Sequence, residues 1–264
     1  MEYQGHCSLE DKEAADFYNG KSLCTFCENE YIFCGTDIFK KQNGEIKRVE
    51  FSTIESKWFG TVKPRNMEQR AAVDMLKDDQ TTIKLITGTW GSGKTLLLTC
   101  AALEAIEHDK FEKIVWIRNN VQVKDTDPLG ALPGDAYDKT LPYLMPFADH
   151  CGGVEGVMRL IDEKKLEVIP LGFLRGRSIK NSIIISSEAE NLTKEHIQLL
   201  IGRVDEGSNL WIDADVRQRD RVSFEKSKGI ETMIERLMGE RLFGYVHLIK
   251  SERSETARLA DKLN

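Results

Sequence analysis

The chain has 264 residues, a net charge of -6 and a pI near 5.6. This acidic balance excludes a globally basic surface for nucleic acid, so any such surface has to be a local patch. No run of about 18 apolar residues is present, which excludes an α-helical membrane span. The N-terminus lacks the basic and then apolar order of a signal peptide, so we expect a cytoplasmic protein with reduced thiols.

Residues 1–60 differ in composition from the rest and hold four of the six cysteines, namely Cys7, Cys24, Cys27 and Cys34. Cys24 and Cys27 form a C-x-x-C pair, a spacing that lets two thiolates bind one metal ion. Cys34, together with Cys7 or His6, would complete a tetrahedral zinc site, although this second pair has no regular spacing. Ordinary buried or free thiols explain the cysteines equally well, and a redox pair is a third reading. We expect residues 1–60 to form a small N-terminal region beside the main domain.

Two local signals follow in chain order. Residues 40–45 predict a hairpin turn, with a strand after it over residues 46–51. After a boundary loop, Asn66 predicts the N-cap of a helix that runs to about Leu76. Gln69 lies in the first turn of that helix, shortly before the next strand. Its amide can donate and accept at once, which suits an adenine edge, whereas a surface glutamine is the commoner explanation.

The stretch from Gly88 to Thr95 fits the phosphate-loop pattern G-x-x-x-x-G-K-[ST] at every fixed position. Residues 83–87 predict a buried parallel strand before it, and residues 96–106 predict a helix after it. Glycines let backbone N–H groups curl around a phosphate, and the helix N-terminus adds favourable partial charge. Lys94 would reach the β- and γ-phosphates of ATP, and the Thr95 hydroxyl would bind Mg²⁺. The residues expected at the nucleotide are Gly88, Thr89, Trp90, Gly91, Ser92, Gly93, Lys94, Thr95 and Leu96.

The remaining chain predicts alternating strands and helices. Strands are expected at residues 113–118, 166–171, 182–186, 210–213 and 245–249, and helices at 193–204 and 230–238. This alternation predicts an α/β fold, a three-layer P-loop NTPase core around a parallel sheet. The long segment from 119 to 146 follows a strand end, where functional loops usually lie.

Two of these strands lead into candidate site residues. Arg175 and Arg177 lie on a glycine-bearing loop, which suits phosphate oxygens of a nucleotide or nucleic acid, with a solvated pair as the alternative. Glu188 follows the strand at 182–186, where a phosphate-loop enzyme keeps its second magnesium motif. It is the candidate to orient or deprotonate the attacking water, and an acidic helix N-terminus is the alternative.

In their order and spacing, the motifs resemble those of the PhoH family, phosphate-starvation-inducible ATPases related to superfamily 1 helicases. The resemblance runs from about Lys63 to the C-terminus. It is carried by Lys63-Pro64-Arg65-Asn66 with Gln69, the phosphate loop, Leu132-Pro133-Gly134-Asp135 with Pro142-Tyr143, Arg175-Gly176-Arg177, Glu188-Ala189 with Asn191, Asp215 with Gln218, and Ser251-Glu252-Arg253-Ser254. The sequence shows no attached nuclease domain of the kind some relatives carry, so a stand-alone ATPase domain is expected over residues 61–264.

The resemblance implies ATP hydrolysis, action on RNA or single-stranded nucleic acid, and a tendency to form homo-oligomeric rings. It further implies that Gln69 contacts adenine and that Arg253 is a phosphate-sensing arginine. We expect Asp213, Asp215 and Gln218 to sense the γ-phosphate. Arg175, Arg177 or Arg253 would complete an ATP site, across a subunit boundary if the arginine is delivered in trans.

The chain departs from the family at two strand ends. The family reads Asp-Glu-Ala-Gln where this chain has Ser187-Glu188-Ala189-Glu190, and Thr-Gly-Asp where it has Asp213-Ala214-Asp215. Related folds place these two strands side by side next to the phosphate-loop strand, about 4.8 Å apart. We therefore hypothesise a reciprocal exchange, in which Asp213 supplies the magnesium-side carboxylate and Ser187 takes the hydroxyl position. Mg²⁺ keeps several waters and tolerates such a move. The alternative is nucleotide binding with lost or feeble hydrolysis.

Three function classes follow from these residues. The first is a helicase-like ATPase or translocase stimulated by RNA or another single strand. The second is a nucleotide-binding switch or scaffold with little turnover, which the serine at position 187 favours. The third and weakest is a nuclease, because the sequence shows no carboxylate cluster beyond the ATP site to hold two metals.

Overall fold

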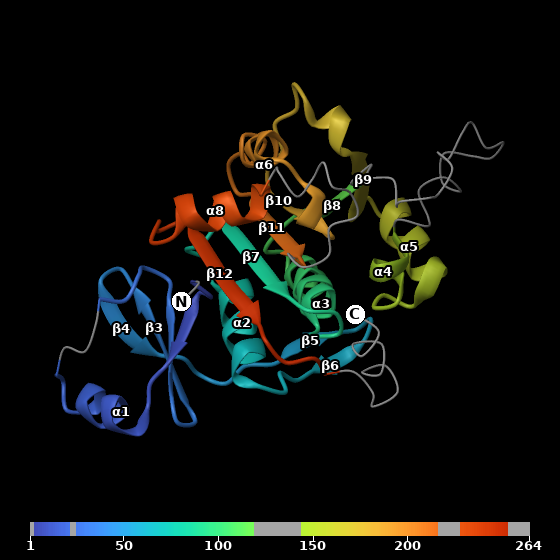
Figure 1. The fold of residues 1–264 in the computed structure, drawn as a ribbon. Helices are drawn as coiled ribbons and strands as arrows, with labels where there is room; N and C mark the ends of the chain where they lie inside the picture. Colours follow the sequence, from blue (N-terminus) through green and yellow to red (C-terminus); the bar gives the residue numbers. More distant parts are fainter. Residues whose placement is uncertain (1–2, 22–24, 119–143, 216–227, 253–264) are drawn as a thin grey trace, which may run out of the picture.

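The computed structural model describes residues 3–21, 25–118, 144–215 and 228–252. Its centre is a six-stranded sheet in the order β12-β7-β11-β10-β8-β9, with every pairing parallel (Figure 1). The strands are β7 (Ile83–Gly88), β8 (Lys113–Arg118), β9 (Leu166–Pro170), β10 (Ser182–Ser186), β11 (Asn209–Ala214) and β12 (Phe243–Leu248). Each predicted strand of this sheet is present with its ends shifted by at most two residues. The predicted α/β core with a parallel sheet is confirmed.

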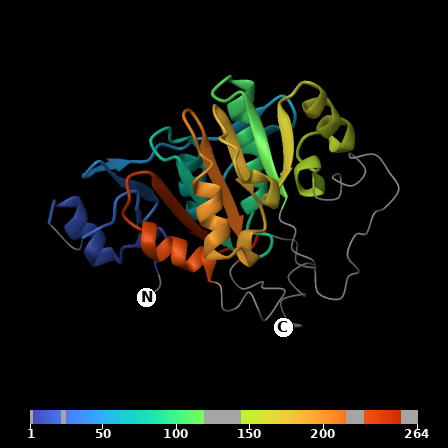
Figure 2. The same cartoon turned by 90° about the horizontal axis from the view of Figure 1, so that it is seen from above.

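Helices cover both faces of the sheet and make three layers (Figure 2). One face carries α2 (Met67–Lys77) and α3 (Lys94–Glu107), with α4 (Met145–Ala148) and α5 (Gly153–Asp162) towards the β9 end. The other face carries α6 (Lys194–Ile201) and α8 (Gly229–Leu237), with the short turns η2 (Leu171–Leu174) and η3 (Ala189–Asn191). Helices α4 and α5 were not predicted from the sequence. Among the described residues, none of the helices has the length and apolar character needed to cross a membrane.

Burial on both faces explains why the central strands read as continuous apolar runs. In β10, Ile183 and Ile185 join the core under α2 and α3, whereas Ile184 joins the core under α6 and α8. A strand with only one buried face would alternate apolar and polar residues instead. Since all six strands are parallel, their carboxyl ends lie along one edge of the sheet, and the loops that follow them meet there.

A second, smaller sheet precedes the core. It contains β1 (His6–Ser8), β2 (Tyr31–Cys34), β3 (Asp37–Gln42) and β4 (Glu45–Arg48) in that order, and α1 (Asp11–Tyr18) follows β1. The predicted hairpin is confirmed: β3 and β4 pair antiparallel around Asn43 and Gly44, both with positive φ. The second strand of the hairpin ends at Arg48, earlier than predicted. A short hairpin of β5 (Ile54–Ser56) and β6 (Gly60–Val62) leads into α2.

The small sheet shares its hydrophobic core with the large one. Tyr31, Phe33 and Ile38 belong to the same buried cluster as residues of α2 and α3. Polar contacts reinforce the packing, because the Tyr31 hydroxyl donates to Asp74 at 2.7 Å and Lys40 pairs with Asp78 at 2.6 Å. The described part of residues 1–60 therefore packs against the core domain.

The N-terminal segment also covers the edge strand β12. The backbone N–H of His247 donates to the Gln4 carbonyl at 3.0 Å, and the N–H of Tyr31 donates to the Gly5 carbonyl at 2.9 Å. The chain at Gln4 and Gly5 thus bridges the two sheets and satisfies backbone groups that an open edge would expose. The approach is close, since a Cβ atom on Gly5 would stand 1.8 Å from the Tyr245 carbonyl oxygen.

Gly5→Ala should therefore destabilise the protein strongly. Gly5 has a φ of +75° and no room for a methyl group, so we expect the free energy of unfolding in urea to fall by at least ~3 kcal/mol. Gly20→Ala is the matched control, because Gly20 has a φ of +72° but no atom within 4 Å of its Cβ position. Backbone strain alone predicts a loss of about 1–2 kcal/mol there. Equal losses in the two variants would contradict this account of the edge.

Candidate functional site

The phosphate loop begins at the last residue of β7 and ends in the first turn of α3. Gly88, Gly91 and Gly93 have φ values of +152°, +70° and +93°, which side chains rarely tolerate. Neighbouring atoms also pack closely against the loop. A Cβ atom on Gly88 would lie 2.5 Å from the Leu248 carbonyl oxygen, and one on Gly93 would lie 3.1 Å from the Gln69 amide nitrogen. The glycines of the motif are therefore required by this backbone and its neighbours.

Polar groups inside the loop suit a phosphate ligand. The Lys94 ammonium donates to the carbonyl oxygens of Gly88 at 2.7 Å and Thr89 at 3.0 Å, so its charge lies across the loop. The Ser92 hydroxyl is buried and has no hydrogen-bond partner within the described part of the chain. Glycine cradle, ammonium and helix N-terminus together form a site that favours an anion.

Gln69 lies directly against the loop. Its side-chain oxygen accepts from the Arg65 N–H at 2.8 Å, and its amide nitrogen donates to the Ser92 carbonyl at 2.9 Å. The side chain is buried, with the residue only 5% exposed. The carbonyl of a glutamine has two lone pairs and its amide nitrogen two hydrogens, so each half retains one further hydrogen-bonding position.

Asp213 is the central carboxylate of the site. It is the penultimate residue of β11, which lies between the phosphate-loop strand and β10, and it is 1% exposed. The Ser187 hydroxyl donates to its Oδ2 at 2.9 Å, and the Glu188 N–H donates to its Oδ1 at 3.1 Å. Burial raises the pKa of Asp213, and those two donors, the Lys94 charge and a hydrogen bond from the Thr95 hydroxyl oppose the rise. The structure thus brings Asp213 into one group with Lys94, Thr95, Ser187 and Glu188.

Further carboxylates gather around Asp213. Glu188 is exposed and has a left-handed backbone, with a φ of +53°. The side chain of Glu190 accepts from the Asp215 N–H at 3.2 Å, which ties the segment after β10 to the end of β11. Burial raises the pKa of Glu190 to about 7, helped by the charges of Asp213 and Glu188. A protonated Glu190 can donate a hydrogen bond, as the glutamine expected at this position would.

The structure does not bring Arg175 and Arg177 to the phosphate loop of the same chain. They follow β9, which lies four strand spacings from β7, about 19 Å by sheet geometry. Both are exposed, and the Arg177 guanidinium pairs with Glu167 of β9 at 2.8 Å. Gln218, Arg253 and the motifs at 132–135 and 142–143 lie outside the described residues.

The predicted zinc site is not assembled by the described cysteines. Cys7 and Cys27 both lie near Tyr3, whereas Cys34 is buried in β2 beside Asp37. Within the described ranges, no group of three or more His, Cys, Asp or Glu side chains is placed to hold a metal ion. Cys24 lies outside those ranges, so zinc binding stays a prediction.

Sequence reasoning missed two contacts beside the loop. The Glu252 N–H donates to the Gly91 carbonyl at 2.8 Å, and the Asn66 amide donates to the Glu252 carboxylate at 2.9 Å. Asn66 and Glu252 belong to motifs that carried the family resemblance, but their spacing in the sequence did not indicate that the two side chains meet. The Thr87 hydroxyl also lies 2.8 Å from His247 Nδ1.

A parallel sheet whose first strand leads through G-x-x-x-x-G-K-T into a helix defines the P-loop NTPase class. The family model described as PhoH-like protein matches residues 61–260, and the chain belongs to the PhoH family.

Curated relatives support the same assignment. The chain is 34% identical over 206 residues to Protein PhoH2 of Thermobispora bispora, covering 76% of this chain and 47% of the relative. It is 32% identical to Protein PhoH2 of Mycolicibacterium smegmatis, with 82% and 50% covered, and 32% identical to that of Bacillus subtilis, with 86% and 52% covered. The chain thus spans about half the length of these relatives.

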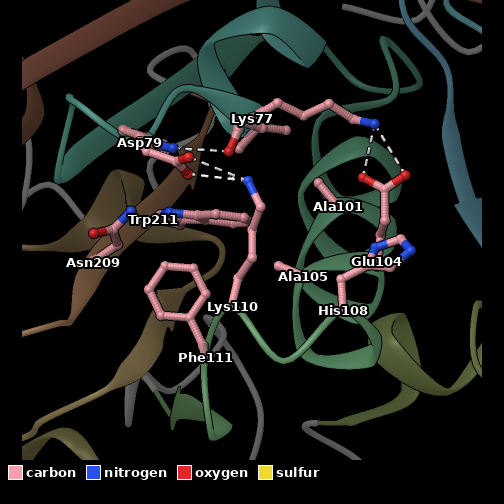
Figure 3. A pocket seen from close by; sticks show the side chains of 12 residues that line it. Lys77, Asp79, Ala101, Glu104, Ala105, His108, Lys110, Phe111, Asn209 and Trp211 are labelled. Atoms are coloured by element: carbon pink, nitrogen blue, oxygen red, sulfur yellow. Dashed lines mark hydrogen bonds and ion pairs between the residues drawn. The ribbon is translucent and has the colours of Figure 1, made fainter.

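A cavity of about 170 Å³ lies at the opposite edge of the sheet, by the amino ends of β7 and β11 (Figure 3). Lysines lining it are already paired: Lys77 with Glu104 at 2.8 Å and Lys110 with Asp79 at 3.1 Å. Lys84, 2% exposed, donates to the carbonyls of Leu76 at 2.8 Å and Asp78 at 2.6 Å and lies 5.2 Å from the centre of the Trp211 ring. Lys84 therefore caps the C-terminus of α2 from inside the fold.

Lys84 should make stability depend on pH. Burial lowers the pKa of its ammonium from 10.5 to about 7, so between these values the unfolded state holds a proton that the folded state has lost. The free energy of unfolding should then rise with pH, by up to about 1.4 kcal/mol per pH unit. We expect the unfolding free energy of wild type minus that of Lys84→Met to increase from pH 7 to pH 10 in urea titrations. Lys110→Met is the control, and a flat difference for Lys84→Met would contradict the assignment.

Proposed function

We propose that this chain binds ATP with Mg²⁺ and hydrolyses it, and that RNA or another single-stranded nucleic acid stimulates the reaction. The observation that carries the proposal is the position of Asp213. It is a buried carboxylate within hydrogen-bonding reach of the phosphate-loop Thr95 and of Ser187. This is the arrangement that the reciprocal exchange requires.

The loop residues supply nucleotide binding. The stretch Gly88–Leu96 surrounds the phosphates, and Lys94 exchanges its two carbonyl contacts for phosphate oxygens. Gln69 reads the adenine edge with the donor and acceptor positions that its two backbone contacts leave open. Trp90, exposed at the tip of the loop, adds an apolar surface beside the nucleotide.

The residues next to the loop fit Mg²⁺. A hydroxyl from Thr95 and a carboxylate from Asp213 are the hard oxygen ligands that this ion takes, either directly or through its waters. Bound Mg²⁺ supplies charge neutralisation at the β- and γ-phosphates. Ser187 and the Glu188 N–H hold the Asp213 carboxylate in place by hydrogen bonds.

Glu188 is the residue that orients the attacking water. Its side chain is exposed at the carboxyl edge of the sheet, and its backbone N–H is fixed on Asp213. Asp215 and Gln218 sense the γ-phosphate from the segment after β11. An arginine completes the charge stabilisation, and Arg253 is the candidate from the same chain.

The position of Arg175 and Arg177 in the strand order supports a ring of several copies. Because Arg175 and Arg177 follow β9, the strand four spacings from the phosphate-loop strand, we assign them to an ATP site in a neighbouring copy. A head-to-tail contact of this kind generates a closed ring when its rotation closes. Both arginines are also exposed and available to the phosphates of a nucleic acid strand.

A nucleotide-binding switch with slow turnover is the second candidate function. It is favoured by Ser187, which cannot replace a carboxylate charge if Asp213 serves only to order the loop. The two candidates make opposite predictions for exchange of the residues at positions 187 and 213.

Asp213→Thr should lower the rate of ATP turnover on the order of 100-fold, because the charge beside Thr95 is lost. Adding Ser187→Asp restores a carboxylate on the neighbouring strand, and we expect most of the rate to return. Steady-state ATP turnover with Mg²⁺ measures both variants, with ADP affinity as the check that the loop is intact. A wild-type rate in Asp213→Thr would remove Asp213 from the site, and failure of the paired exchange to recover would favour the switch.

ATP turnover should rise when single-stranded RNA is added, and Lys94→Ala should abolish it with and without RNA. The lysine is needed because no other group in the loop supplies a full positive charge to the phosphates. Tight ATP binding with no turnover would identify a switch. RNA cleavage that survives Lys94→Ala would identify a nuclease.

A further inference from the structure

Glu252 contacts the phosphate loop from outside. Its backbone N–H donates to the Gly91 carbonyl at 2.8 Å, and its carboxylate accepts from the Asn66 amide at 2.9 Å. Asn66 is itself fixed as the N-cap of α2, because its side-chain oxygen accepts from the Gln69 N–H at 2.8 Å. The start of α2, the phosphate loop and the chain after β12 therefore meet at one point.

Gln69 makes a second contact of the same kind. Its amide nitrogen donates to the carbonyl of Ser92, the residue after Gly91, at 2.9 Å. Two successive carbonyls of the loop are thus held by groups outside it. In a planar trans peptide, the carbonyl of one residue and the N–H of the next point to opposite sides. Fixing the carbonyls of Gly91 and Ser92 therefore directs the N–H groups of Ser92 and Gly93 towards the inside of the loop, where the Ser92 N–H donates to the Thr89 carbonyl at 3.3 Å.

The loop needs such external contacts because its own sequence is permissive. Gly91 and Gly93 carry no side chains and have φ values of +70° and +93°, so neither residue confines the backbone to one shape. A loop that is in its binding shape only part of the time binds with an apparent affinity reduced by that fraction. Contacts that hold the carbonyls raise the fraction.

We infer that Glu252 is a positioning residue for nucleotide binding. Its carboxylate is anchored on Asn66, which places its backbone N–H on the Gly91 carbonyl and so keeps the loop in the shape that receives a phosphate. The inference rests on the proposed ATP-binding function, and it gives Glu252 a role through the loop and not through contact with the nucleotide.

Calorimetric titration of the full chain with Mg·ADP tests this role without any contribution from hydrolysis. Glu252→Ala removes the acceptor for Asn66, and we expect its affinity to fall roughly tenfold, the usual effect of losing one charge-assisted hydrogen bond. Glu252→Gln keeps a side-chain oxygen that can accept from Asn66, and its affinity should stay within about threefold of wild type. Glu240→Ala, an exposed glutamate at the amino end of β12, is the control and should bind as wild type.

Exchanging donor and acceptor between the two positions separates positioning from general destabilisation. Asn66→Asp keeps an oxygen that can cap α2 but loses the amide donor and places two carboxylates together, so affinity should fall. Adding Glu252→Gln supplies an amide that can donate to the new carboxylate, and affinity should recover. A merely structural loss at position 66 would not be repaired by a second substitution at position 252.

The outcomes are distinct. If wild type takes up no ADP, the proposed function and this inference fall together. If wild type binds but Glu252→Ala binds equally well, the proposed function stands and the inference is overturned. It is also overturned if Asn66→Asp weakens binding and the paired exchange brings no recovery.

Discussion

The hydrogen bonds that hold the buried Asp213 carboxylate are the interaction on which the site depends. A carboxylate at 1% exposure is costly unless donors surround it. Here the donors follow the two strands that flank β11. Ser187 and the Glu188 N–H come directly after β10, and Thr95 lies at the end of the phosphate loop after β7. The carboxylate can be shared in this way only because β11 lies between β7 and β10. Strand order therefore decides which acidic residue can serve the nucleotide.

The rest of the fold positions that edge. Parallel strands deliver every functional loop to the same side of the sheet, and helices on both faces bury the strands that carry them (Figure 2). The N-terminal sheet closes the β12 edge through Gln4 and Gly5, and β12 in turn packs its Leu248 carbonyl against Gly88 at the start of the loop. The N-terminal region, which differs most in composition from the rest of the chain, thus supports β12, the strand next to the phosphate loop.

What could be predicted from the sequence was local. The strands of the core, the phosphate loop and the Asn66 cap each depend on a few consecutive residues whose preferences agree with the fold. The pairing of Asp213 with Ser187 could be predicted because the family pattern showed that the chain departs from it at these two strand ends. By contrast, the contacts of Glu252 with Gly91 and of Tyr31 with Asp74 join residues far apart in the chain, and no local pattern encodes them. The distance of Arg177 from the phosphate loop likewise followed only once β9 was placed at the end of the sheet.

A crystal structure of the chain with Mg²⁺ and a non-hydrolysable ATP analogue tests the central claim most directly. The account predicts a metal ion held by the Thr95 hydroxyl, with the Asp213 carboxylate bound to it directly or through one of its waters, and Ser187 hydrogen-bonded beside them. A metal ion placed with Asp213 turned away, or bound instead by Glu188 or Glu190, would contradict it.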